Sequence, residues 1–182
     1  MRRGFRMVRH LLLALAVGMV CSCGKTAGVG DPCVPEDEAN ADFPGFSMNE
    51  VSLETRSVQC ESRLCLVNHF QGRVGCPQGQ DDGTGACKTA TGLQVTVPIR
   101  GWDTDRPASK TVHCSCRCDG PDPNARYCEC PSGFTCAKLF DDLGLGSAEL
   151  AGSYCIRDGS EFHSTQEGGA TCRTEPENPV CQ

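Results

Sequence analysis

The sequence predicts a small disulfide-rich fold built from short β-strands, hairpins and loops with at most one short helix. Three observations support this prediction. Cysteine accounts for 16 of the 182 residues, a fraction typical of disulfide scaffolds. Leu, Ile, Val and Phe make up only about 16% of residues 23–182, too few to fold a strongly charged chain by apolar burial. Short strand-like runs are separated by segments rich in glycine and proline, so covalent bridges are expected to replace much of the core.

The N-terminus has the pattern of an export signal. Residues 1–10 carry four arginines and residues 11–20 are apolar, as in the charged and apolar regions of a secretory signal peptide. The apolar run is too short to span a bilayer. We therefore predict a signal peptide of the lipoprotein type over residues 1–22. Its removal takes the net charge from −6 to about −10, since four arginines and no acidic residue are lost, and such an acidic chain argues against a nucleic-acid partner.

A cysteine suited to lipid attachment follows the apolar run. Val20-Cys21-Ser22-Cys23 resembles the lipobox of bacterial lipoproteins, which has an aliphatic residue three positions before the acylated cysteine and a small residue directly before it. Cys23 is the predicted lipid anchor, because its acylation leaves 14 cysteines, an even number, whereas acylation of Cys21 leaves 15. Cys21 departs from the residues usual at its position, so an ordinary cleaved signal and an uncleaved anchor stay open as alternatives.

The resemblance to lipoproteins also implies a location. In bacterial lipoproteins, a residue other than aspartate after the anchor usually means the outer membrane, and here that residue is Gly24. Residues 23–32 then form a lipidated tether that glycine makes flexible, and the membrane is a partner through the lipid. We therefore expect an exported protein, anchored by lipid at the outer membrane or cell surface.

Fourteen cysteines remain for disulfide bonds if Cys23 is acylated. Two cysteines separated by one residue rarely bridge to each other, because so short a ring strains the geometry that a disulfide needs. The cysteines of the C-x-C pairs should therefore reach other segments, although the connectivity stays open. The predicted disulfide cysteines are Cys33, Cys60, Cys65, Cys76, Cys87, Cys114, Cys116, Cys118, Cys128, Cys130, Cys136, Cys155, Cys172 and Cys181.

Three short strands are predicted in the first part of the chain. Residues 51–54 alternate apolar and polar side chains, residues 64–70 form an apolar run of strand length, and residues 93–97 alternate with β-branched residues. Pro98 ends the third strand or places it at a sheet edge. Residues 75–85 are rich in turn formers and are predicted to be a loop.

A hairpin, a helix and a last strand are predicted after residue 110. Residues 111–118 and 127–130 would pair across a long loop, with the three cysteines of the first strand on one face and His113 pointing outward on the other. Residues 137–143 form the one predicted helix, which a glycine would end. Residues 153–157 have the pattern of a final strand.

The cysteine distribution divides the exported chain into two parts after the tether. Residues 33–157 are predicted to form a disulfide-rich domain. Residues 158–182 form a C-terminal tail that is rich in small and polar residues and can be held only by Cys172 and Cys181.

No catalytic residue, metal site or cofactor is predicted. The chain lacks the G-x-S-x-G, H-E-x-x-H and P-loop motifs, and redox chemistry at the C-x-C pairs would need an accessible thiol with a low pKa. Zinc is the rival of disulfides, but only Cys60 and Cys65 have a comparable spacing, and an oxidising compartment removes the thiolates that zinc needs. His69, His113 and His163 stand apart in the sequence.

Two acidic turns offer oxygen ligands for calcium. One holds Asp103 and Asp105, and the other holds Asp119, Asp122 and Asn124. Neither has the glycine and glutamate positions of an EF-hand loop. We therefore interpret both as solvated acidic loops.

Trp102 is the predicted centre of a binding site. It lies in a polar turn between Arg100 and Arg106, and an exposed tryptophan among charged residues is typical of a binding hot spot. A cap over a small disulfide core explains the same tryptophan equally well. The expected partner of such a site is a protein or a glycan.

Two further cysteine patterns resemble known families. Residues 128–136 (CECPSGFTC) are similar to the C-terminal half of an EGF-like module. The segments 30–33 (GDPC), 60–65 (CESRLC) and 75–76 (GC) resemble the pattern of cysteine-rich surface lipoproteins of the myxobacterial type, with a long insertion after the first cysteine. Together with the signal, the second resemblance covers most of the chain and implies a surface address without a reaction.

Location and architecture together predict a class of function. We expect a non-enzymatic, lipid-anchored envelope or surface protein whose disulfide-held module binds a ligand or maintains structure. The alternative is a peptidase-inhibitor-like or toxin-like secreted scaffold, in which a loop such as residues 90–109 presents a substrate-like segment. An enzyme or redox protein is the third hypothesis.

Overall fold

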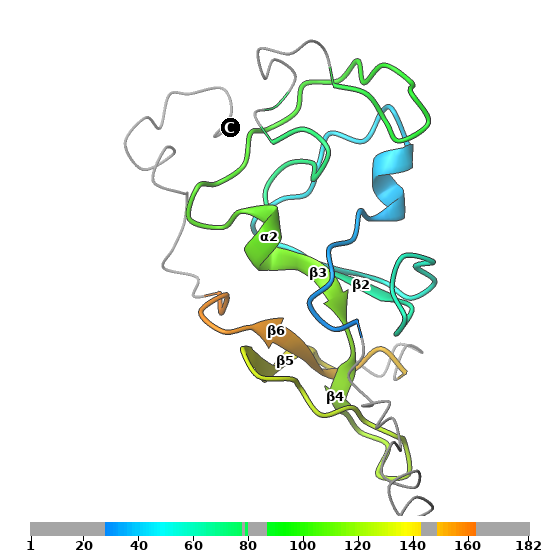
Figure 1. Ribbon diagram of the computed structural model, residues 1–182, viewed down its shortest axis with the longest axis vertical. Helices are drawn as coiled ribbons and strands as arrows, with labels where there is room; N and C mark the ends of the chain where they lie inside the picture. The colour runs from blue at the N-terminus through cyan, green and yellow to red at the C-terminus, as the bar shows by residue number, and fades with distance from the viewer. Residues whose placement is uncertain (1–27, 78, 80–86, 143–148, 163–182) are drawn as a thin grey trace, which may run out of the picture.

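Two small antiparallel sheets lie beneath a layer of loops (Figure 1). The computed structural model describes residues 28–77, 79, 87–142 and 149–162. Its strands have three to seven residues and its one α-helix has four, which confirms the predicted disulfide-rich fold of short strands. The elements are η1 (Glu36–Ala39), β1 (Val51–Glu54), β2 (Leu64–Asn68), α2 (Ala108–Thr111), β3 (Val112–Ser115), β4 (Arg117–Asp119), β5 (Phe134–Phe140) and β6 (Gly152–Arg157).

Strand β2 lies at the centre of the first sheet, between β1 and β3. Its side chains alternate between two cores. Cys65 and Val67 face the loop layer, whereas Leu66 faces the second sheet and packs against Tyr154 and Ile156. Because β2 is buried on both faces, its sequence is a continuous apolar run without alternation.

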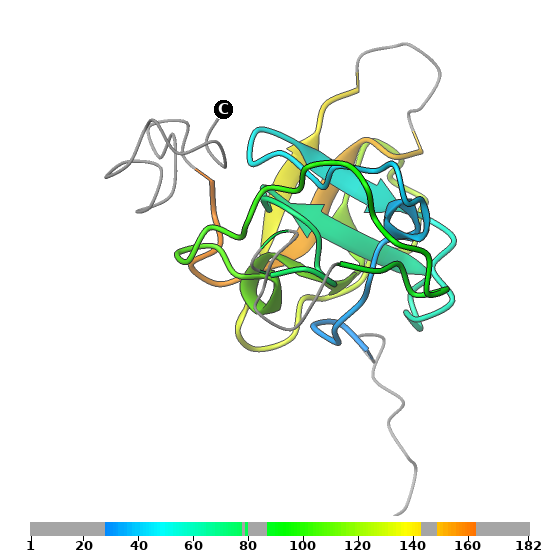
Figure 2. The ribbon, with the colours of Figure 1, turned by 90° about the horizontal axis from the view of Figure 1, so that it is seen from above.

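Strand β6 lies at the centre of the second sheet, between β4 and β5. Seen from above, β1 and β2 cross over β5 and β6 (Figure 2). Strand β3 continues into β4 after the single residue Cys116. One short stretch of chain therefore links the two sheets.

Six disulfides join twelve of the fourteen predicted cysteines. None of the described C-x-C pairs closes on itself, which confirms the expectation from ring geometry. Cys172 and Cys181, like Cys21 and Cys23, lie outside the described residues. The six bridges are Cys33–Cys65, Cys60–Cys114, Cys76–Cys87, Cys116–Cys128, Cys118–Cys136 and Cys130–Cys155.

Strand β5 corrects the helix predicted at residues 137–143. Phe134–Phe140 pairs with β6. Ala137 and Leu139 pack against the core between the two sheets, and Cys136, directly before Ala137, bridges to Cys118 of β4. Sheet pairing and a disulfide therefore override the local helix preference. The last residue of the predicted helix lies outside the described residues.

The strand predicted at residues 93–97 is also wrong. The structure has only an isolated bridge between Lys88 and Gln94 in this part of the chain. Val95 and Ile99 are buried against the Cys76–Cys87 bridge in a small core of their own. The alternation is followed only in part, because Val95 is buried whereas Leu93 is 58% exposed, and the segment belongs to a disulfide-held loop.

The predicted hairpin of residues 111–118 and 127–130 does not form. Strand β4 pairs with β6, and one backbone hydrogen bond, from the N–H of Cys128 to the oxygen of Arg117 at 3.0 Å, joins the two predicted strands. His113 does not point outward either. It is 1% exposed, because the second sheet covers the face of β3 opposite Cys114.

The remaining strand predictions are confirmed. The structure has β1 at residues 51–54, β2 within residues 64–70, and β6 over residues 153–157 with one more residue at its start. Within the part of the chain that is described, no helix is long and apolar enough to cross a membrane.

The packed body extends into the predicted C-terminal tail. Ser160 is fully buried, and its carbonyl accepts hydrogen bonds from Asn68 Nδ2 at 3.0 Å and Arg106 Nη2 at 2.9 Å. The ring of Phe162 stacks on His69 with the centroids 3.8 Å apart. Residues 158–162 therefore pack on the domain by direct contact, and the rest of the tail lies outside the described residues.

Candidate binding surface

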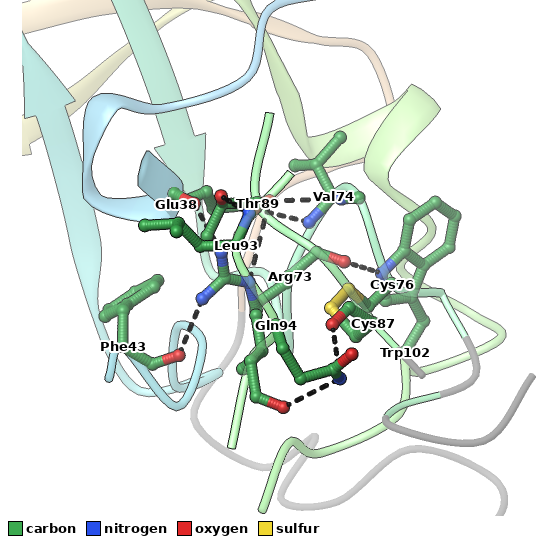
Figure 3. Close-up of a disulfide and its surroundings, with 12 residues drawn as sticks. Glu38, Phe43, Arg73, Val74, Cys76, Cys87, Thr89, Leu93, Gln94 and Trp102 are labelled. Carbon is green, nitrogen blue, oxygen red and sulfur yellow. Dashed lines mark hydrogen bonds and ion pairs between the residues drawn. A yellow bond between two sulfur atoms is a disulfide. The ribbon is translucent and has the colours of Figure 1, made fainter. Parts of the chain in front are cut away.

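Trp102 caps the core beneath the loop layer. Its ring meets Phe70 edge to face with the centroids 5.5 Å apart, and its Nε1–H donates to the oxygen of Arg73 at 2.6 Å (Figure 3). The side chain is half-buried. These contacts match the interpretation of Trp102 as a cap, and a binding role for its exposed part stays a prediction.

Arg106 is placed inside the protein. It is 4% exposed and donates to the backbone oxygens of His69 at 2.8 Å and of Asn68 and Ser160 at 2.9 Å. Burial lowers the pKa of its guanidinium. Of the three predicted binding residues, Arg100 is exposed, Trp102 half-buried and Arg106 buried, so the structure does not bring them together on one open surface.

A second buried arginine organises the loop layer, and sequence reasoning missed it. Arg73 is 1% exposed and donates to the backbone oxygens of Phe43 at 2.8 Å, Asn40 at 3.0 Å and Glu38. Its Nε lies 4.0 Å from Glu38 Oε2. Figure 3 shows this guanidinium between the segment of Glu38 and Phe43 and the Cys76–Cys87 bridge. The spacing of these residues in the sequence gives no indication that Arg73 contacts them.

Glu38 completes the same contact from the other side. Its carboxylate accepts hydrogen bonds from the backbone N–H groups of Val74 and Gly75, the second at 3.1 Å. Burial raises its pKa, although these bonds and Arg73 oppose the shift. The two side chains together hold the segments 38–43 and 73–75 in one arrangement, which is a structural role.

The described histidines are engaged with backbone oxygens. His113 Nε2 lies 3.2 Å from the oxygen of Cys155, and Ser115 Oγ donates to the same oxygen at 2.8 Å. Burial lowers the pKa of His113 and of His69, whose Nδ1 lies 2.8 Å from the oxygen of Met48. His113 and Ser115 therefore share one acceptor and do not form a base and nucleophile. His163 lies outside the described residues.

Neither metal hypothesis gains a free set of ligands among the described residues. The groups of cysteine sulfurs that lie within 4.8 Å of one another consist of disulfide cysteines, and a disulfide sulfur offers no thiolate for zinc. In the acidic turns, a carboxylate oxygen of Asp103 accepts the N–H of Asp105 and one of Asp122 accepts the N–H of Asn124, both at 2.9 Å. These oxygens close their own turns.

The clearest feature of a binding surface is a loop over residues 57–63, which we call the Val58 loop. Val58 is 84% exposed, whereas Ser57 and Cys60 on either side are buried. The N–H of Ser57 donates to the oxygen of Arg63 at 3.1 Å. Cys60 is bridged to β3 through Cys114. An apolar side chain is therefore displayed to solvent on a backbone that is held at both ends.

The backbone of Val34 is hydrogen-bonded to the Val58 loop. Gln59 donates through Nε2 to the oxygen of Val34 at 2.7 Å and accepts its N–H at 3.1 Å. Val34 itself is 36% exposed. The available sequence signal was that Val34 directly follows Cys33 and that Val58 lies two residues before Cys60, but their exposure could not be read from the sequence.

Comparisons with protein-family models, with curated proteins and with solved structures found no match to this chain. The resemblances to lipoproteins of the myxobacterial type and to an EGF-like module therefore stay predictions. Function has to be argued from the residues themselves.

Proposed function

We propose that this chain is an exported, lipid-anchored envelope or surface protein whose disulfide-held body presents a non-catalytic binding surface. The observation that carries the proposal is the Val58 loop, in which an apolar side chain is 84% exposed on a backbone fixed by a buried disulfide. A side chain on a backbone that is already fixed loses little conformational freedom on binding, and an apolar side chain suits an apolar pocket of a protein. A protein is therefore favoured over a glycan as the ligand.

The six disulfides support export. They account for all twelve described cysteines, and structural bridges in such number are typical of oxidising compartments. Apart from the cysteines, few apolar side chains pack in the described region. The protein would therefore lose much of its stability if its disulfides were reduced in the cytosol. Export and the signal at residues 1–22 are consistent with each other.

The anchor is tested by metabolic labelling with palmitate. We expect label on the wild-type chain and on Cys21→Ala, and none on Cys23→Ala. Intact mass of the membrane-extracted protein, alkylated before reduction, should show the lipid on Cys23 and no alkylated thiol. Label that follows Cys21, or a free thiol, would contradict the proposed anchor and the parity argument behind it.

The binding surface is tested by Val58→Asp against Leu93→Asp. Leu93 is 58% exposed on a different loop and is thus a matched control. With short-range crosslinking on intact cells, we expect Val58→Asp to reduce the yield of the wild-type crosslinked complex at least about tenfold, as loss of an interface anchor would. Leu93→Asp should retain that complex. Equal yields from both variants would overturn the role of the Val58 loop.

A peptidase-inhibitor function is the second candidate, and the same loop favours it. An inhibitor presents one exposed side chain on a rigid segment, and Val58 would suit a protease with a small aliphatic pocket. Within the segment 90–109, by contrast, Val95, Ile99 and Arg106 are buried. A panel of serine proteases with elastase-like preference decides the matter: inhibition that Val58→Asp abolishes supports this candidate, and no inhibition removes it.

A further inference from the structure

The three disulfides of the second sheet form one cluster of sulfur atoms. The Sγ of Cys155 lies 3.7 Å from the Sγ of Cys116 and 3.7 Å from that of Cys128. The Sγ atoms of Cys118, Cys130 and Cys155 lie within 4.8 Å of one another. Sulfur released from one bridge would therefore lie close to the next. The cluster consists of Cys116–Cys128, Cys118–Cys136 and Cys130–Cys155.

One end of this sulfur cluster is open to solvent. Among the twelve cysteines that the structure describes, Cys136 alone is exposed, and its partner Cys118 is half-buried. Cys136 lies on β5, at the edge of its sheet. Cys155, which it faces across the β5–β6 pair, is fully buried. A thiol in solution can therefore reach the cluster at Cys136, and accessibility governs which disulfide is attacked.

A hollow of about 310 Å³ is lined by residues that closely follow the two cysteines of the exposed bridge in the sequence. It is lined by Lys138, two residues after Cys136, by Asp119, directly after Cys118, and by Ser153 of β6. The volume is at the lower end for small-molecule sites. The ammonium group of Lys138, whose side chain is 67% exposed, is ion-paired with Asp141 at 2.5 Å. Asp119 and Asp142 also line the hollow, so the charges beside Cys136 are mixed in sign.

We propose that the Cys118–Cys136 bridge is a thiol-exchange site that takes up a small thiol and passes the exchange into the sulfur cluster. The thiolate sulfur of the incoming molecule bonds to Cys136 Sγ, the bond to Cys118 breaks, and its electron pair leaves on Cys118 Sγ. The Cys118 thiolate then attacks the Cys130–Cys155 bridge, bonds to one of its sulfurs and releases the other as thiolate. Each step replaces one disulfide with another, so the small thiol is the only co-reactant.

Reduced glutathione is the probe for this proposal. The full-length mature protein is exposed to it at neutral pH, quenched by alkylation and mapped by mass spectrometry of its peptides. We expect the first adduct on Cys136, followed by new bridges from Cys118 to Cys130 or Cys155. The Cys33–Cys65 and Cys60–Cys114 bridges, whose cysteines are at most 3% exposed, should open at least about tenfold more slowly. A first adduct elsewhere, or simultaneous opening of all bridges, would overturn the proposal.

Lys138→Glu tests the hollow without removing a cysteine. Charge reversal at this exposed site should slow the reaction with glutathione about 3- to 10-fold. The reaction with 2-mercaptoethanol should slow less, because its thiolate carries a smaller negative charge than that of glutathione. Lys88→Glu is the control, because Lys88 is exposed on the loop layer, and it should change neither rate. If Lys138→Glu alters both rates equally or neither, the hollow does not recruit the thiol.

The double variant Cys118→Ser with Cys136→Ser tests the entry point itself. Glutathione uptake by the cluster should then fall to the rate of the buried bridges, and an unchanged rate would place the entry elsewhere. The exchange requires neither the lipid anchor nor the Val58 loop. Failure of the thiol-exchange proposal would therefore not affect the proposed function. Failure of the proposed function would likewise not affect the thiol-exchange proposal.

Discussion

Arg73 and Glu38 show how much one buried pair can organise in a chain with little apolar core. The guanidinium of Arg73 donates hydrogen bonds to backbone oxygens of the segment around η1. The carboxylate of Glu38 accepts hydrogen bonds from the N–H groups of the two residues that follow Arg73. These hydrogen bonds offset much of the cost of burying the two charges, although Arg73 Nε has only the ion pair with Glu38 and no hydrogen bond. The pair therefore specifies the arrangement of loops that have no ladder of their own.

Removing the carboxylate is expected to be costly. Glu38→Ala leaves Arg73 without its counter-charge and leaves the N–H groups of Val74 and Gly75 without an acceptor, so the free energy of unfolding should fall by about 3–5 kcal/mol. Urea unfolding measures the change. Glu36→Ala, at an exposed position of the same turn, is the control and should stay within about 0.5 kcal/mol of wild type. A loss of similar size in both variants would contradict the special role of Glu38.

His113 gives the protein a pH-dependent stability. Burial holds its pKa below the ordinary value of 6.5, so between the lowered value and 6.5 the native state binds fewer protons than the unfolded state. Stability is then full above about pH 6.5 and falls as the pH drops through the range below it. His69 acts in the same direction. Glu38, whose pKa is raised, acts oppositely, since its contribution is lost as the pH rises above 4.5.

Replacing His113 should flatten part of that dependence. In His113→Gln, an amide N–H can still donate to the oxygen of Cys155 without titrating. We expect the free energy of unfolding of this variant to decline less than that of wild type between pH 7 and pH 5, as followed by urea titration at each pH. His69→Gln reports the separate share of His69. Parallel pH profiles for wild type and His113→Gln would show that His113 is not a source of the decline.

At the scale of elements, close approach of backbones decides where strands can pair. Gly152 begins β6 with φ +138°, a region that glycine favours, and a Cβ atom built there would collide with the backbone oxygen of Asp119 on β4. The register of β4 with β6 also shifts between Arg117 and Asp119. Glycine at this position is therefore a condition for the β4–β6 contact.

Gly152→Ala should consequently be more damaging than Gly133→Ala. Gly133 also has positive φ, at +86°, but a Cβ there meets nothing within 4 Å, so its alanine variant bears backbone strain alone. We expect Gly152→Ala to lower the free energy of unfolding by at least about 2 kcal/mol more than Gly133→Ala does. Thermal and urea unfolding provide the comparison. Equal losses would mean that β4 can move away from β6 without cost.

At the scale of the whole molecule, disulfides link segments that lie far apart or close together in the sequence. Cys60–Cys114 spans 54 residues and lies in the core of the first sheet, whereas Cys76–Cys87 spans 11 and lies in the loop layer. A bridge across a longer stretch removes more entropy from the unfolded chain. The two bridges should therefore differ in their contribution to stability.

We expect the double alanine variant of Cys60 and Cys114 to lose about 1 kcal/mol more from chain entropy than that of Cys76 and Cys87, and still more from the emptied core. The second variant should keep the near-UV circular dichroism of the folded sheets, and the first should not. The reverse order of stabilities in urea would contradict the assignment of Cys60–Cys114 to the central core.

Local patterns predicted the strands that had local causes. The alternation at residues 51–54 and the apolar run at the start of β2 were sufficient to predict these strands. Burial of one or both faces of a strand determines the pattern of apolar residues within the strand itself. The segment around Ala137 was mistaken for a helix because its pairing with β6 depends on residues about 17 positions away. Likewise, Trp102 and Arg106 looked like surface residues, since no local feature marks a turn that folds back onto a core.

The sequence by itself determined that this chain is a disulfide-held protein of short strands, because cysteine content and the scarcity of apolar residues are properties of composition. Only the tertiary structure decided which cysteines pair, which arginines are buried and where Val58 and Cys136 are exposed. Those outcomes depend on contacts between residues as far apart as Cys60 and Cys114. Such contacts arise when two sheets and a loop layer close on one another, and no short stretch of the chain contains that information.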